Sequence, residues 1–337
     1  MKLKILSLLC IVVTLLFSGF SAEQKPKEDQ IIRVAVDMVS LPVVVTDKAG
    51  RRITDLKKED FQIYEDGAKQ EIVGFAATDE PICVALVLDT SGSTELRLAK
   101  IQNAAIKFVH QLHPDDEVAV LSFADDVRLQ EDFTIDRDRN EYGIKKTRTG
   151  GWTALYEAVW LAMEDVLKPV RERKAMVLFT DGVDNHSGKA TINETLELAK
   201  ESPATIYCVY YNTELDQEEI NRKPRLGGSQ PTIVWNPLPP SVVNTGAGSS
   251  PGEYERGRRY LDGLADYSGG LVLDGTTNLE DAFAQIAKEL ASQYSLGYYS
   301  SNPRHDGKFR KIQVKLNKPG LVARTKKGYY TKKDKKM

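Results

Sequence analysis

The stretch ICVALVLDTSGST, residues 82–94, decides the fold. Its first seven residues are apolar and run without interruption into an aspartate. An unbroken apolar run of this length is typical of a strand buried on both faces, as in a parallel sheet covered by helices. The following loop carries Asp89, Ser91 and Ser93, each two residues apart. We therefore expect several oxygen-bearing side chains at the carboxyl end of a buried strand.

The apolar pattern of the first strand recurs three times, in the runs VAVLSF, AMVLFT and TIYCVYY. The segments between these runs have a helical period. Residues 95–112 place one apolar stripe on a single face, formed by Leu98, Ile101, Ala105, Phe108 and Leu112. Residues 154–167 do the same. This alternation predicts an α/β fold over residues 82–292, a doubly wound and mostly parallel sheet with helices on both faces.

Two helix starts are marked by capping residues. Thr191 with Glu194 fits a capping box, in which each side chain binds the other residue's backbone N–H. Asn278 is placed to cap a helix over residues 279–290. This last helix of the α/β unit leads directly into the segment that follows it.

The segments on either side of the α/β unit alternate apolar and polar residues, which predicts antiparallel strands with one wet face. Residues 31–80 contain turn signals at Lys48–Gly50 and at Asp66–Gly67. Residues 293–330 carry three more such runs, followed by a basic tail at 331–337. Neither flank has many strands, so we expect the two to form one shared β-sandwich. Two independent β lobes are the alternative.

Residues 215–253 are rich in Pro, Gly, Ser and Asn and have no helical period. The segment is too long for an ordinary connection, and we interpret it as an inserted loop. It leaves the carboxyl end of a sheet strand, so it is a candidate lid with Trp235 as a partner contact. A surface insert without a role is the alternative.

The N-terminus has the pattern of a secretory signal peptide, here residues 1–22. Two lysines precede a short apolar core, which ends in small residues. Residues 23–30 follow as a polar linker. An uncleaved anchor is the alternative, but the run is short for a membrane span. Because no second long apolar stretch occurs, we expect a secreted or periplasmic protein with no transmembrane span after cleavage.

Asp89 and Asp181 each stand at the end of an apolar strand, where ligands bind in doubly wound sheets. Ser91 and Ser93 add two hydroxyl groups, and Thr153, in GGWTAL, adds a third. This set contains oxygen atoms only. It suits a hard cation, Mg²⁺ above all, with Mn²⁺ or Ca²⁺ as alternatives. With few carboxylates around it, such a cation would accept an acidic group from a protein partner.

The DTSGS loop, the Thr in a Gly-rich turn and the later TDG together resemble the von Willebrand factor type A (VWA) domain and its metal-ion-dependent adhesion site. The resemblance covers residues 82–292 and implies metal ligands at Asp89, Ser91, Ser93, Thr153 and Asp181. The flanks resemble secreted bacterial proteins with a VWA-related domain. One local departure is the bulky Trp152, which we expect at the rim as a partner contact. Asp-x-Ser-x-Ser alone is also compatible with a helix cap and turn.

The family's strand order also bears on the two cysteines outside the signal peptide. It places Cys83 and Cys208 two strands apart, with another strand between them. Strands two apart are separated by roughly 10 Å, beyond the reach of a disulfide. The resemblance thus implies two buried free thiols.

The leading hypothesis is a secreted, metal-dependent protein-binding module for adhesion or assembly, and not an enzyme. A serine nucleophile would need a histidine base, and His186 is the histidine nearest to Asp181 in sequence. The alternatives are a structural component of an envelope assembly without metal-dependent binding, and a metal-dependent hydrolase. The formal net charge of −2 gives no indication of a nucleic-acid partner.

Overall fold

The structure is a computed structural model and describes residues 38–213, 251–302, 304 and 306–331. The predicted signal peptide and linker therefore lie outside the described residues. So does most of the predicted insertion, up to residue 250. The last three residues of that insertion begin helix α7 at Pro251. Among the described residues, no helix is long and apolar enough to cross a membrane.

Strand β5 (Ile82–Asp89), the apolar run of the opening stretch, lies inside a six-stranded sheet with the order β10-β9-β8-β5-β6-β7. Its neighbours β8 and β6 run parallel to it, and β9 and β10 continue the parallel part. Strand β7 closes the sheet at one edge and is antiparallel to β6. The predicted mostly parallel sheet is thus confirmed. The bounds of the other strands are β6 Glu117–Phe123, β7 Val127–Thr134, β8 Arg173–Thr180, β9 Thr205–Tyr210 and β10 Val272–Asp274.

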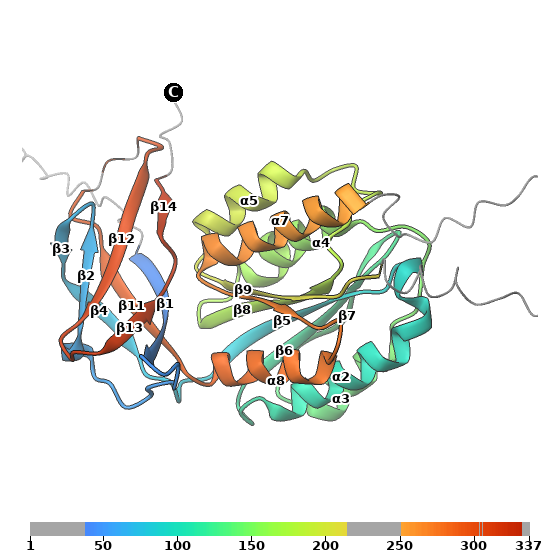
Figure 1. The fold of residues 1–337 in the computed structure, drawn as a ribbon, viewed down its shortest axis with the longest axis horizontal. Coiled ribbons are helices and arrows are strands. Elements are labelled where there is room, and N and C mark those ends of the chain that lie inside the picture. The colour runs from blue at the N-terminus through green and yellow to red at the C-terminus, as the bar shows by residue number, and fades with distance from the viewer. Residues whose placement is uncertain (1–37, 214–250, 303, 305, 332–337) are drawn as a thin grey trace, which may run out of the picture. The chain divides into compact units, whose positions relative to one another are not determined.

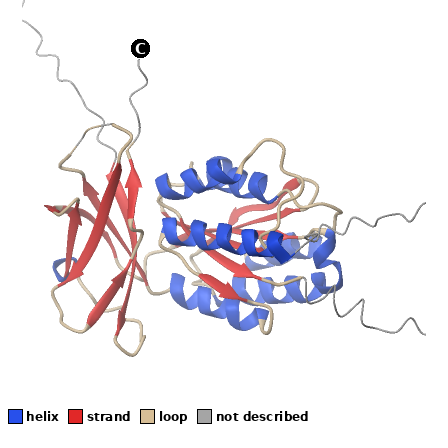
Figure 2. Cartoon of the chain, turned by 45° about the horizontal axis from the view of Figure 1, so that its top comes forward, coloured by secondary structure: helices blue, strands red, loops and turns tan. Residues whose placement is uncertain are grey.

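Helices cover both faces of this sheet (Figure 1). Alternate residues of β5 enter two separate cores, because successive strand residues point to opposite faces. Leu86 packs with the core of α2 and α8, whereas Val87 packs with that of α4, α5 and α7. Figure 2 shows the helices on either side of the strands. The helix bounds are α2 Leu98–Gln111, α3 Arg137–Lys146, α4 Leu155–Leu161 with a π-helical turn at Ala162–Leu167, α5 Ile192–Glu201, α7 Pro251–Ser268 and α8 Leu279–Leu290.

Both predicted helix caps are present. The Thr191 hydroxyl accepts a hydrogen bond from the Glu194 N–H (3.3 Å), and the Glu194 carboxylate accepts one from the Thr191 N–H (2.9 Å). The Asn278 side chain accepts a hydrogen bond from the Asp281 N–H at 3.1 Å. These contacts fix the first turns of α5 and α8.

The two flanking segments form a shared β-sandwich, as predicted. One sheet has the order β13-β1-β11-β4 and the other β14-β12-β2-β3, so each contains strands from both flanks. Their facing side chains form one core that includes Leu41, Ile63 and Tyr294. The strand bounds are β1 Met38–Asp47, β2 Phe61–Glu65, β3 Ala68–Gln70, β4 Ile72–Ala76, β11 Gln293–Tyr299, β12 Phe309–Leu316, β13 Leu321–Arg324 and β14 Gly328–Tyr330.

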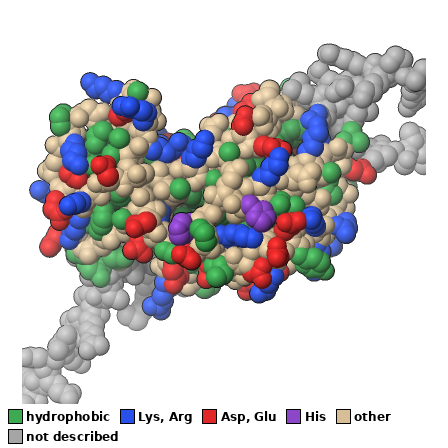
Figure 3. Space-filling view, turned by 90° about the horizontal axis from the view of Figure 1, so that it is seen from below, with side chains coloured by type: hydrophobic (Ala, Val, Ile, Leu, Met, Phe, Trp, Pro, Cys, Tyr) green, Lys and Arg blue, Asp and Glu red, His purple; other side chains and the backbone are tan. Residues whose placement is uncertain are grey.

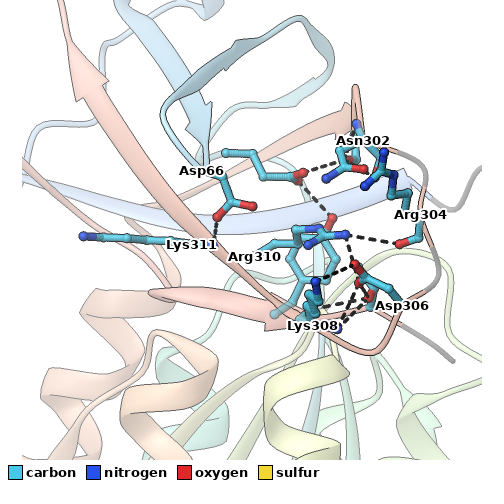
Figure 4. Close-up of polar contacts among 11 residues, drawn as sticks. Asp66, Asn302, Arg304, Asp306, Lys308, Arg310 and Lys311 are labelled. Carbon is cyan, nitrogen blue, oxygen red and sulfur yellow. Dashed lines mark hydrogen bonds and ion pairs between the residues drawn. The ribbon is translucent and has the colours of Figure 1, made fainter.

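Polar contacts at the turns of the sandwich link residues that are distant in sequence (Figure 4). Asp66 occupies the predicted hairpin turn with a φ of 48°, a conformation that few residues other than glycine adopt. Its carboxylate accepts a hydrogen bond from the Lys311 N–H of β12 at 2.9 Å. Nearby, Arg310 pairs with Asp306 at 3.0 Å. The Asp66 contact links the β2–β3 hairpin to β12, whereas the Arg310–Asp306 pair fixes the turn that precedes β12.

Arg173, at the start of β8, binds both chain connections between the α/β unit and the sandwich. Its guanidinium donates to the carbonyl groups of Ala77 and Glu80, before β5, and to those of Leu290 and Gln293, after α8. Of the two contacts after α8, the hydrogen bond to the Gln293 carbonyl is the shorter, at 2.6 Å. One half-buried arginine therefore binds both chain connections.

The two cysteines are free and buried, as the resemblance implied. Cys83 lies on β5 and Cys208 on β9, and β8 runs between these strands. Burial raises the pKa of the Cys83 thiol to about 12. Both thiols therefore remain protonated and act as small apolar side chains.

Candidate metal centre

Five residues were predicted to supply oxygen ligands, and we refer to them as the oxygen set: Asp89, Ser91, Ser93, Thr153 and Asp181. Asp89 is the last residue of β5, and Asp181 follows the last residue of its neighbour β8. Ser91 immediately precedes a 3₁₀ helix at Gly92–Arg97, and Ser93 is the second residue of that helix. All five residues are buried, and Ser93 is the most exposed at 6%.

A chain of hydrogen bonds connects four members of the oxygen set. The Ser91 hydroxyl donates to Asp89 Oδ1 at 2.6 Å, and the Ser91 N–H donates to the same oxygen at 2.9 Å. The hydroxyl groups of Ser91 and Ser93 lie 3.1 Å apart. Ser93 in turn hydrogen-bonds the Asp181 carboxylate. The two strand ends are thus joined through the serines of the first loop.

Two threonines outside the prediction complete this network. The Thr180 hydroxyl donates to Asp89 Oδ2 at 2.7 Å, and the Thr213 hydroxyl donates to Asp181 Oδ2 at 2.6 Å. Each carboxylate therefore has one oxygen held by a threonine and the other held by its own loop. Thr180 precedes Asp181 at the same strand end, which is a local signal that the sequence offered. Thr213 is brought in from beyond β9 by the sheet order, so no local pattern marks it.

The loop that carries Thr153 is anchored on both sides. The Thr153 N–H donates to the Asn185 side chain at 2.8 Å, and its carbonyl accepts from the N–H groups of Asn185 and His186. The Gly150 N–H donates to the Thr90 carbonyl at 2.9 Å, next to Asp89. The Thr153 loop is thereby fixed between the other two loops of the oxygen set.

The local geometry requires a glycine at the third position of the TDG motif. Gly182 has a φ of 81°, in the left-handed region that favours glycine. A Cβ at this position would also lie 2.7 Å from the backbone of Gly257 on α7. Only glycine allows helix α7 to pack directly on the loop that holds Asp181.

The two carboxylates destabilise each other's charged forms. Burial is the main cause that raises the pKa of Asp181, and the charge of Asp89 raises it further. Burial also raises the pKa of Asp89, against the opposing effect of its hydrogen bonds from Ser91 and Thr180. Two buried acids this close carry an electrostatic cost that a cation between them would offset.

The donor set fits a hard divalent cation. Two carboxylates and three hydroxyl groups are oxygen donors, the type that Mg²⁺, Mn²⁺ and Ca²⁺ prefer. Within the described ranges, no cluster of three or more His, Cys, Asp or Glu residues forms a different metal site. The two carboxylates match the charge of one divalent cation, and the three hydroxyl groups add neutral oxygen ligands.

The rim of the site carries exposed apolar side chains. Trp152 is 40% exposed, and its ring stacks on that of His186 with 5.8 Å between centroids. Leu96, in the 3₁₀ helix after Ser93, is 72% exposed. Trp235, the other predicted contact, lies outside the described residues.

Comparison with known proteins agrees with this arrangement of strands and loops. Residues 84–231 match the family model of the von Willebrand factor type A domain. The chain contains a VWA domain. The matched range includes every member of the oxygen set. No curated protein matches the sequence.

Several solved structures resemble the chain at low identity. BatB from Bacteroides thetaiotaomicron is 19% identical, with a TM-score of 0.42 over 62% of this chain and 97% of that one. A von Willebrand factor type A protein from Catenulispora acidiphila is 13% identical, with a TM-score of 0.46 over 81% and 72%. Proximal thread matrix protein 1 from the mussel byssus, with zinc in its metal-ion-dependent adhesion site (MIDAS) motif, is 16% identical. Its TM-score is 0.45 over 67% of this chain, which spans 49% of that protein.

Proposed function

We propose that the chain is a secreted, metal-dependent protein-binding module for adhesion or assembly. In this proposal the VWA domain at residues 82–292 binds the partner, and the flanking segments 31–80 and 293–330 carry it as a β-sandwich. The signal-peptide pattern at residues 1–22 supports export to the periplasm or the exterior. VWA domains act mostly as interaction modules, which supports a binding role for the matched residues.

One observation carries the proposal, the two buried carboxylates Asp89 and Asp181, which are linked through hydrogen bonds of the serine hydroxyl groups. A protein gains no stability from two buried acids without a cation, because each opposes the ionisation of the other. Their retention is best explained by a metal ligand role. The hydroxyl groups of Ser91, Ser93 and Thr153 would complete the protein's share of the coordination.

The proposed cation is Mg²⁺, with Mn²⁺ or Ca²⁺ as alternatives. When bound, it would supply a position for a carboxylate from the partner. The protein's own residues bind and orient the ion. Thr180 donates to one oxygen of Asp89, and Thr213 donates to one oxygen of Asp181. Such outer contacts orient the direct ligands.

The rim supports a binding role over catalysis. His186 is the histidine nearest to Asp181 in sequence, and its ring is stacked on Trp152. We assign both rings, with Leu96, to the surface that meets the partner. Acidic and basic side chains are interspersed on the face seen in Figure 3, which supports a protein partner over a nucleic acid.

Titration calorimetry with Mg²⁺ and Mn²⁺ on the mature chain tests the proposal. We expect one ion per chain, and we expect the variant Asp89→Ala to lose it. The control Asp165→Asn removes one exposed carboxylate from α4's π-helical turn and retains binding. A folded wild-type chain that takes up neither ion, in the presence of acetate to complete the coordination, would refute the metal-dependent role.

A further inference from the structure

A cleft of about 530 Å³ opens beside the oxygen set, between the β6–β7 edge of the sheet and the segment 146–150. Thr90, between Asp89 and Ser91, forms part of its wall. The Thr90 carbonyl accepts the Gly150 N–H at 2.9 Å, and its hydroxyl donates to the Phe123 carbonyl at 3.1 Å. The cleft and the candidate metal centre therefore share a wall.

Three cationic side chains line this cleft, which we call the basic cleft: Arg128, Lys146 and Arg148. Lys146 and Arg148 form no ion pair with any residue that the structure describes. Arg148 uses Nη1 to donate to the carbonyls of Lys145 and Thr147, and this contact fixes the guanidinium at the cleft. Arg128 lies 3.5 Å from Asp126, and both side chains are exposed.

The acidic residues of the basic cleft do not balance these cations. Asp125 holds the Thr153 loop, because its carboxylate accepts the N–H groups of Gly151 (2.8 Å) and Trp152 (3.0 Å). These backbone hydrogen bonds lower the pKa of Asp125. The charged carboxylate is therefore already used to hold the Thr153 loop. Asp126 faces Arg128 alone. The cations of Lys146 and Arg148 thus remain for a ligand, and the long, exposed pair with Asp126 leaves Arg128 able to join them.

The floor of the basic cleft is suited to a carboxylate on a short apolar stem. Ser122 is buried, and its hydroxyl oxygen accepts from the Gln130 side chain at 2.8 Å, which leaves its own hydrogen to donate to a ligand. Ala124 and Leu129 add apolar wall. Methylene groups of a glutamate side chain fit this combination, with the acid directed at the cations.

We propose that the basic cleft is a second subsite, which binds an acidic side chain of the partner whose other carboxylate reaches the cation. This proposal rests on the proposed function for the identity of the partner. It specifies that partner as a peptide segment with two acids, one for each subsite. The shared wall at Thr90 makes both subsites accessible to one segment.

The test uses a fluorescein-labelled octapeptide of alternating glutamate and alanine as the probe. Its binding is measured by fluorescence anisotropy at low salt, with Mg²⁺ and with chelator. The variant combines Arg128→Gln and Arg148→Gln. Its control combines Arg139→Gln and Lys145→Gln, which remove the same charge from helix α3 outside the cleft. We expect the first variant to weaken probe binding by about tenfold or more, and the control by less than about twofold.

Mg²⁺ calorimetry on the same variants separates the two proposals. We expect unchanged Mg²⁺ binding in the Arg128/Arg148 variant, because neither residue belongs to the oxygen set. Arginine-dependent probe binding in a chain that takes up no Mg²⁺ would support the basic cleft and refute the metal-dependent role. Equal probe binding by both variants, or none by the wild type, would overturn the basic cleft. AMP serves as a phosphate-bearing control ligand. If it binds in an arginine-dependent way and the peptide does not bind, the proposal of a subsite for an acidic side chain is overturned as well.

Discussion

The buried Lys326 gives the sharpest quantitative prediction. Only 3% of this residue is exposed, and its ammonium donates to the carbonyl of Ser202, at the end of helix α5, over a long 3.4 Å. Burial lowers the pKa of Lys326 from its usual 10.5 to about 8. A pKa difference of this size corresponds to a cost of about 3 kcal/mol when the lysine is charged. Losing the long hydrogen bond would cost about 1 kcal/mol.

The variant Lys326→Met should therefore be more stable than the wild type by about 2 kcal/mol at pH 7. Between pH 8 and 10.5 the unfolded wild type binds more protons than the folded one. Its stability accordingly rises with pH across this window, and the advantage of the variant disappears. Urea unfolding at pH 7 and at pH 10 measures both effects.

Lys327→Met is the matched control, because the Lys327 side chain is 73% exposed and pairs with Asp266 at the surface. It should change the free energy of unfolding by less than about 1 kcal/mol at either pH. A Lys326→Met variant that is less stable than the wild type, by an amount independent of pH, would refute this reasoning. It would mean that the buried ammonium is fully compensated in the folded protein.

Three further changes test other parts of the account. In chelator, Asp181→Asn should raise the Tm by roughly 2–5 °C, because it removes one of two buried charges. Calorimetric scans should also show that Mg²⁺ no longer raises the Tm of this variant, whereas a lower Tm in chelator would contradict the electrostatic argument. Thr180→Val keeps the shape but removes the donor to Asp89, so titration calorimetry should give an Mg²⁺ affinity about tenfold lower; unchanged affinity would exclude a positioning role. Arg173→Met should lower the free energy of unfolding in urea by about 3 kcal/mol, because four carbonyl groups, three of them in partly buried contacts, lose their donor. Arg171→Met, an exposed neighbour, should have little effect, and equal losses in the two variants would count against the Arg173 contacts.

The sequence predicted the central sheet because its strands are unbroken apolar runs between segments of helical period. The opening stretch contains both signals, an apolar strand and the polar loop at its end. The helix caps at Thr191 and Asn278 could also be predicted from the sequence, because a cap depends on residues three apart in sequence.

Some elements carried weaker signals. Strand β7 is half exposed at the sheet edge, so its residues lack a continuous apolar run. Helix α3 is strongly polar and buries only Asn140, Gly143 and Ile144. The first turn of α7 begins at Pro251, inside a stretch whose composition indicated a loop. In each case tertiary contacts, not local periodicity, fix the element.

The residues of the candidate site likewise fall into those with a local sequence signal and those that only the fold brings together. The grouping of the oxygen set was predictable because four members stand at a strand end or directly after it, and Thr153 stands just before a predicted helix. Thr213 and Asp125 were not, because their roles depend on loops that only the sheet order brings together. The basic cleft is of the same kind, since its cations come from β7, from the last residue of α3 and from the segment after α3.

Anomalous diffraction from crystals of the mature chain grown with Mn²⁺ would locate the bound cation. We expect one strong peak, about 2 Å from the hydroxyl oxygens of Ser91, Ser93 and Thr153 and beside the two aspartates. A chain that binds Mn²⁺ in solution but places the peak elsewhere, with the oxygen set empty, would contradict the account.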